Sequence, residues 1–423
     1  MGMPLLEIND IRLRIGLAGT ILGSEPGWAL CSDPPLVGEA ARANARRQPR
    51  LANSQFWHQL TTDPIPGATA SIRHHADLAF LQLQQLIDCS TETQLAIAIP
   101  PHYQRDDMQL LLGLAEAASV KVKALIDPAV LLAQFASPDS ETVLYLDASL
   151  YALSMTTITQ GAHLQRLNAQ LIHPAGYQHT IDRLASASAN RLIQSHRFDP
   201  MHQADTEQQL FDQLYQGIDG SGTLGEPAMS LYHDAAQYDV RLTEEDLRAA
   251  SAEMVPSLVR AINAEVNGAT EVLVSDRVAR LPGLAHAMSL IPGITLNTLS
   301  SLALFEAFEE FQPDLRASQD MRQLILSRRN PNDRQQDSQQ NSDTVITPTH
   351  VLQNGLAIAL ERFQAQDNLQ FTLSKITATE QWQISPNRIA LSINQKAATS
   401  IQTLKAGDTV HVGRETFQFI RVS

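Results

Sequence analysis

The sequence has 423 residues, of which 43% are hydrophobic, and its formal net charge at pH 7 is −14. A chain of this length exceeds what one hydrophobic core usually serves, so we expect two or three domains. The net negative charge argues against a general nucleic-acid-binding protein, because neutralising phosphates requires a clustered basic surface.

The cysteine content and the hydropathy of the chain indicate where the protein works and what it binds. The two cysteines, Cys31 and Cys89, form neither a metal-ligand spacing nor a disulfide framework, which is typical of a reducing compartment. No basic N-terminal segment precedes a long apolar run, and no window has the length of a membrane span. We therefore expect a cytoplasmic protein that does not insert into membranes and whose partners are other proteins.

The first part of the chain predicts a β-meander followed by an α/β unit. Short apolar runs between glycines over 5–30 predict two or three strands. Helical spacing predicts helices at 71–87 and 105–119, and apolar runs predict strands at 93–100 and 120–126.

The next part repeats this order. Strands are expected at 143–146, 152–158, 162–172 and 272–274. Helices are expected at 179–192, 205–217, 243–266, 283–290 and 297–311. Thr243 is predicted to open its helix with a capping box, and Asn297 is predicted as the N-cap of the last helix.

A polar segment divides this α/β part from the end of the chain. Residues 328–344 contain almost no side chain to bury and predict a disordered linker. Short strands with turn residues over 345–423 predict a small all-β module. The expected division is 1–140 and 141–327 as two similar α/β lobes, then the linker and the module.

The duplicated order resembles the two lobes of the actin-like ATPases, which have a ribonuclease H-like fold. Local motifs in the same sequence order are similar to the nucleotide-binding domain of the seventy-kilodalton heat-shock proteins over roughly 5–312. They are V-G-E-A-A at 37–41, I-A-I-P-P-H-Y at 97–103, V-K-A-L-I-D-P at 122–128 and V-L-V-S-D-R-V-A-R-L-P at 272–282. The resemblance implies a two-lobed α/β fold, a chaperone-like role, and ATP with Mg²⁺ between the lobes.

In that family, two glycine-bearing turns fold over the triphosphate, because residues without a Cβ let backbone N–H groups approach phosphate closely. At the first turn, I-D-L-G-T-T of the family corresponds to 8–13 here, so Ile11 replaces the glycine. The metal-side carboxylate would be at Asn9, or at Asp10 if the register slips.

At the second turn, one alignment makes Asp147 the metal-side acid, and the other places Tyr145 and Ala152 at the acidic positions. A plain β-turn is the alternative interpretation of Asp147. At the adenosine strand, Ser275 and Asp276 stand where the family has glycines. The family's nucleotide contacts would thus fall on Asn9, Asp10, Ser149, Ser275 and Arg277.

Asp127 corresponds to the glutamate of the family's E-P motif, which makes Asp127 and Asp147 the candidate catalytic residues. The alternative for Asp127 is a helix N-cap, since Pro128 suits the first helical position. His58 or Gln59 lies near the position of the family's catalytic lysine. We predict no metal-ligating cluster of side chains.

Residues 391–419 are similar to the closing hairpin of forkhead-associated domains, without the phosphothreonine-reading motifs upstream. Three functions are therefore considered: a scaffold with a degenerate ATP site, an ATP-binding chaperone with divergent phosphate turns, and a phosphopeptide adaptor. The loss of turn glycines favours the scaffold and predicts ATP turnover at or below background.

Overall fold

The computed structural model describes most of the chain, which divides into two compact units, Met1–Arg328 and Arg329–Ser423. The described residues are 2–66, 68–69, 71–160, 163–219, 229–266, 268–311, 315–316, 325–327, 348–353, 356–364, 371–376, 381–386, 391–394, 396–398, 401–406, 408–412 and 415–420. The predicted linker at 328–344 lies outside these ranges.

The first sheet has five strands in the order β3-β2-β1-β7-β8. Strands β1, β2 and β3 form an antiparallel meander, and β7 and β8 continue the sheet in parallel with β1. The bounds are β1 Leu5–Glu7, β2 Leu13–Leu17, β3 Thr20–Glu25, β7 Gln94–Ala98 and β8 Lys121–Ile126.

The second sheet repeats this arrangement in the strands β11-β10-β9-β14-β15, with β17 and β16 added beside β11. Strands β9 to β11 are antiparallel, whereas β14 and β15 run parallel to β9. The bounds are β9 Thr142–Ala148, β10 Leu153–Gln160, β11 His163–Ile172, β14 Thr270–Val274, β15 Ile294–Thr298, β16 Leu315–Arg316 and β17 Ile325–Ser327. The expectation of a mixed α/β protein is thus confirmed.

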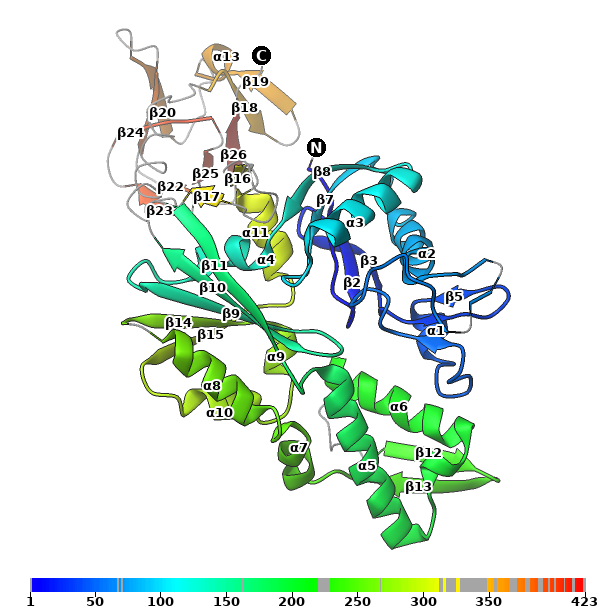
Figure 1. Ribbon diagram of the computed structural model, residues 1–423. Helices are drawn as coiled ribbons and strands as arrows, with labels where there is room; N and C mark the ends of the chain where they lie inside the picture. Colours follow the sequence, from blue (N-terminus) through cyan, green and yellow to red (C-terminus); the bar gives the residue numbers. More distant parts are fainter. Residues whose placement is uncertain are drawn as a thin grey trace. The chain divides into compact units, whose positions relative to one another are not determined.

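Several helices pack against the two sheets (Figure 1). Helices α2 (His75–Ile87) and α3 (Arg105–Ala117) share one buried cluster with the first sheet. Helices α4 (Pro128–Leu132) and α11 (Ala303–Phe311) share a second cluster with residues from both sheets. Side chains alternate between the two faces of β9, and both faces are buried. Val143 and Tyr145 belong to the second cluster, whereas Leu144 and Leu146 belong to a third.

The third cluster covers the other face of the second sheet with the remaining helices of the unit. They are α5 Tyr177–His196, α6 Ala204–Asp219, α7 Glu244–Ser251, α8 Val255–Glu265, α9 Asp276–Ala279 and α10 Leu284–Ser289. Smaller elements are β4 Ala29–Leu30, β5 Leu36–Val37, α1 Glu39–Arg42, β6 Ala52–Asn53, β12 Met229–His233 and β13 Ala236–Val240. None of the helices in the described ranges has both the length and the apolar character that crossing a bilayer requires.

Two predicted helices differ in the structure. The helix expected over 243–266 starts as predicted, with the Thr243 side chain accepting from the Asp246 N–H, but it is broken between α7 and α8. Pro256 explains the break, because its ring has no N–H and clashes with the carbonyl four residues earlier.

The prediction that a helix begins at Asn297 is wrong. Asn297 lies in β15 opposite Leu273, and its side-chain amide donates to Glu271 at 3.1 Å. Pairing with β14 therefore outweighs the capping preference, and the helix begins at Ala303 instead.

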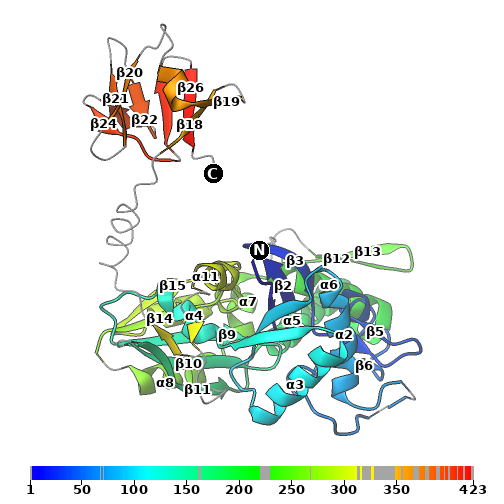
Figure 2. The same cartoon turned by 90° about the horizontal axis from the view of Figure 1, so that it is seen from above.

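The second unit contains two antiparallel sheets, which Figure 2 shows side by side. One has the order β19-β18-β26-β25-β22-β23 and the other β20-β21-β24. The bounds are β18 His350–Gln353, β19 Leu356–Ala359, α13 Leu360–Gln364, β20 Phe371–Lys375, β21 Trp382–Pro386, β22 Leu391–Ile393, β23 Lys396–Ala398, β24 Gln402–Thr403, β25 Thr409–Val412 and β26 Glu415–Ile420. A fourth cluster of buried side chains, including Phe363 and Phe419, fills this unit.

Removing residues 328–423 should leave the first unit folded. The three clusters of that unit draw only on residues before 312, whereas the fourth draws only on residues after 350. A chain ending at residue 327 should therefore melt in one cooperative transition, as followed by circular dichroism. Loss of a cooperative transition in the shortened chain would contradict this division.

Candidate functional site

The turn after β1 approaches the end of β9 and the turn that follows it, and side chains of the first turn bond to the backbone there. The Asn9 side chain accepts from the Ile11 N–H at 3.0 Å and donates to the Ala148 carbonyl at 2.9 Å. The Asp10 carboxyl accepts from the Leu150 N–H at 2.7 Å. The two turns are thus joined directly by protein hydrogen bonds.

Asp10 is buried, and burial raises the pKa of its carboxyl to about 7, although hydrogen bonds from backbone N–H groups oppose the shift. A large fraction of Asp10 is therefore protonated at neutral pH. Ser149 lies in the second turn, where its hydroxyl donates to the Ala152 carbonyl and accepts from the Ala152 N–H. The Ser149 hydroxyl thus closes its own turn.

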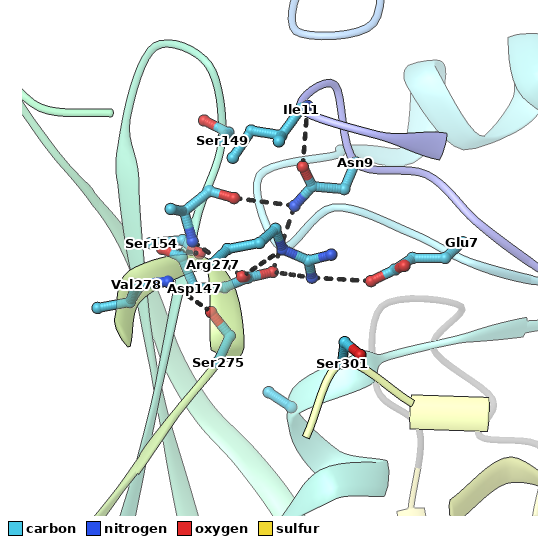
Figure 3. Close-up of polar contacts among 12 residues, drawn as sticks. Glu7, Asn9, Ile11, Asp147, Ser149, Ser154, Ser275, Arg277, Val278 and Ser301 are labelled. Carbon is cyan, nitrogen blue, oxygen red and sulfur yellow. Dashed lines mark hydrogen bonds and ion pairs between the residues drawn. The ribbon is translucent and has the colours of Figure 1, made fainter. Parts of the chain in front are cut away.

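Arg277 connects acidic side chains from the two sheets (Figure 3). Its Nε and Nη2 donate to the two carboxylate oxygens of Asp147, at 2.9 and 2.8 Å. Nη2 also donates to Glu7 at 2.8 Å, and the second Glu7 oxygen accepts from Arg14 Nε at 2.6 Å. The Glu7, Asp147 and Arg277 side chains are only 4%, 13% and 8% exposed, which makes this a buried charge network.

The charges in this network stabilise one another. Burial alone would raise the pKa of Glu7, but the charges and hydrogen bonds of Arg14 and Arg277 outweigh it and lower that pKa. Burial would likewise lower the pKa of Arg277, yet Asp147 and Glu7 hold it well above its ordinary value. Glu7 and Arg277 are therefore charged at neutral pH.

Local structure places Arg277 in this position. Ser275 follows β14 and caps α9, with its hydroxyl accepting from the Val278 N–H at 3.2 Å. The cap starts the helix immediately after the strand and sets Arg277 in its first turn. Ser275 is thus a structural cap, and Arg277 is occupied by carboxylates rather than free.

Asp127 has the role that its alternative interpretation predicted. It caps α4 by accepting from the Ala129 N–H at 3.0 Å, and its second oxygen accepts from Arg166 at 3.2 Å. Arg166 also donates to the Pro101 carbonyl at 2.8 Å. Asp147, by contrast, lies within strand β9 and not in the β-turn that was the alternative for it.

The predicted site residues line two neighbouring hollows. A small cavity of about 40 Å³ has Asn9, Asp10, Asp127, Asp147 and Ser149 in its lining. Ser275 and Arg277 lie together in the lining of a neighbouring hollow, which also includes Glu7 and Arg14.

Two histidines line the 40 Å³ cavity as well. The rings of His58 and His102 are 4.9 Å apart, and burial lowers the pKa of His102 to about 4. His58 was the sequence candidate near the family's lysine, whereas His102, Glu7 and Arg166 were not singled out. An acid in the apolar strand L-L-E was the available signal for Glu7.

The arrangement does not fit the Mg²⁺ of the resembled family. Asp147 is already paired with Arg277, Asn9 presents an amide N–H to Ala148, and Asp10 is partly protonated and accepts from the Leu150 N–H. A divalent cation prefers charged or carbonyl oxygens that are free to coordinate it. Within the described residues, no group of three or more His, Cys, Asp and Glu side chains is arranged to bind a metal.

Comparison with known proteins adds no family: the sequence matches no protein-family model and no curated protein.

The substitution Asp10→Asn should change how stability depends on pH. Because the folded pKa is about 7 and the ordinary value is 3.8, only the unfolded chain ionises between these limits, so the wild type loses stability as pH rises. The substituted asparagine cannot ionise in either state. The variant should therefore gain about 1.4 kcal/mol per pH unit relative to wild type from pH 4 to 7, and nothing further above pH 7. A stability difference that is constant from pH 4 to 8 in urea titrations would contradict this.

Removing the buried cation should be costly. Arg277→Met leaves Glu7 and Asp147 buried with one partner fewer, so we expect a loss of about 3 kcal/mol in the free energy of unfolding. Arg248→Ala is the control, because it removes an exposed ion pair with Glu244 and should cost less than about 1 kcal/mol. Equal losses in the two variants, measured by urea unfolding, would show that the Arg277 network contributes little.

Proposed function

We propose that this chain is a cytoplasmic, heat-shock-protein-70-like member of the actin-like superfamily that acts as a protein-interaction scaffold and not as an efficient ATPase. The repeated strand order of the two sheets supports the duplicated lobes of that superfamily. The first lobe carries the turn at Asn9 and Asp10, and the second carries the turn at Ser149. Both turns lie at the ends of the first strands of their sheets, as expected of phosphate-binding turns in such a fold.

One observation carries the proposal: Arg277 is bonded to both Glu7 and Asp147. Phosphoryl transfer depends on positioning and on neutralising phosphate charge, usually with Mg²⁺. Here Arg277 supplies the positive charge, and Glu7 and Asp147 are already paired with it. The network is complete without a nucleotide.

The space between the turns supports the same conclusion. Ile11 stands where the family has glycine and is 5% exposed, so its side chain fills the position of a close backbone approach. The bonds from Asn9 to Ala148 and from Asp10 to Leu150 join the turns that a triphosphate would separate. Side chains therefore hold the two lobes together, as a scaffold requires. The β-module at 345–423 is proposed as a second protein-binding part.

Nucleotide binding through divergent turns is the second candidate. The observation that favours it is a cleft of about 300 Å³ that is lined by residues of the turn after β1, of α6 and of α9, and that includes Arg12, Trp28 and Tyr215. Aromatic and guanidinium groups can hold a base and phosphates. This candidate requires a mode of binding that does not use the family's glycine turns.

Titration calorimetry and a turnover assay separate the two candidates. The scaffold predicts millimolar or absent affinity for Mg-ATP and Mg-ADP and no turnover above background. If turnover occurs, Asp127 would position water and Asp147 would face the metal, so Asp127→Asn and Asp147→Asn should each lower the rate by at least about a hundredfold. Asn remains a good N-cap, so Asp127→Asn should stay folded.

Robust Mg²⁺-dependent turnover that both substitutions abolish would refute the scaffold. Turnover that neither substitution changes would indicate a contaminating ATPase.

A further inference from the structure

The 300 Å³ cleft is rich in positive side chains although the whole chain is acidic. Its lining includes five arginines and two aspartates. They are Arg12, Arg14, Arg42, Arg277 and Arg280, with Asp219 and Asp276.

Three of these arginines are nearly buried and already paired with carboxylates. Arg14 and Arg277 contact Glu7 and are 11% and 8% exposed. Arg42 contacts Asp212 at 3.1 Å and is 10% exposed. Exchange of such a partner for a ligand would leave a buried charge unpaired, which is costly.

Arg12 and Arg280 differ, because their side chains are 34% and 36% exposed. Both contact Asp219, the last residue of α6. Arg12 Nε and Nη2 approach one Asp219 carboxylate oxygen at 2.9 and 2.8 Å, and Arg280 donates to the Asp219 main-chain carbonyl. Arg280 also pairs with Asp276 at 3.4 Å. Ion pairs with this exposure contribute little to stability, so another anion can replace the carboxylate.

The two arginines approach the cleft from different lobes. Arg12 directly precedes β2 of the first sheet, and Arg280 directly follows α9 after the second sheet. Between them Asp219 presents a carboxylate and a carbonyl, an extended set of acceptor oxygens. An oligophosphate presents a similar row of oxygens with more charge, and guanidinium groups bind phosphate oxygens well.

We propose that Arg12 and Arg280 form a site for an oligophosphate group bound without a divalent cation, and that Asp219 holds the place of that group in the free protein. The proposal rests on the proposed function, in which this cleft carries out no hydrolysis, and it adds a ligand class to the cleft. The phosphates come from an inorganic chain or from a nucleotide. The cation that such ligands normally bring is supplied by the protein.

Calorimetric titration of the full chain in EDTA tests the site, with inorganic tripolyphosphate, ATP and adenosine as probes. Tripolyphosphate should bind to the wild-type chain, and its Kd should rise with NaCl concentration. Asp219→Asn should lower that Kd by about threefold, since an internal competitor is removed. Arg12→Ala should raise it by about tenfold, whereas the control Arg248→Ala should leave it unchanged.

Equal binding of ATP and tripolyphosphate would support an inorganic source as well as a nucleotide, and tighter ATP binding would identify a nucleotide. Absence of binding by both anions to wild type and to Asp219→Asn would overturn the site. Binding that requires Mg²⁺, or adenosine binding as tightly as ATP, would also overturn it. Because EDTA prevents Mg²⁺-dependent turnover, failure here leaves the scaffold proposal standing.

Discussion

The buried Arg277 guanidinium is the interaction on which the centre of the first unit depends. It contacts Asp147 on the second sheet and Glu7 on the first, residues that are 130 and 270 positions away in sequence. Two buried carboxylates this close would repel each other and lose hydration without a cation. The arginine removes that conflict and joins the sheets at the point where a nucleotide would lie in the proposed superfamily.

Apolar packing around the network fixes the positions of its side chains. Helices α4 and α11 share a buried cluster with both sheets, so the sheets are fixed beside each other by apolar packing as well as by charge. Asp127 starts α4, and Arg166 ties that helix start to the Pro101 carbonyl. Hydrophobic burial supplies most of the stability in such a core, and the charge network determines which side chains face one another.

Local sequence patterns predicted much of this fold but not the content of the site. The succession of strands and helices along the chain, the Thr243 cap and the Asp127 cap follow from periodicity and capping preferences, which act over a few residues. The break at Pro256 was readable from the same rules. The strand at Asn297 was not, because its pairing with β14 is a tertiary effect that overrides local propensity.

The site itself depends on contacts between distant residues. Resemblance brought Asn9, Asp10, Asp127, Asp147 and Arg277 to attention, but it assigned Arg277 to a ligand. Only the folded chain shows that Arg277 pairs with Glu7 and Asp147, because no periodicity records an ion pair across 270 residues.

The central claim is that protein side chains join the two turns without a nucleotide. Amide hydrogen exchange at Leu150, whose N–H is bonded to Asp10, tests it most directly. The account predicts strong protection in EDTA and no further protection on adding Mg-ATP. Fast exchange in EDTA that becomes slow with Mg-ATP would show that a nucleotide, and not the side chains, joins the turns.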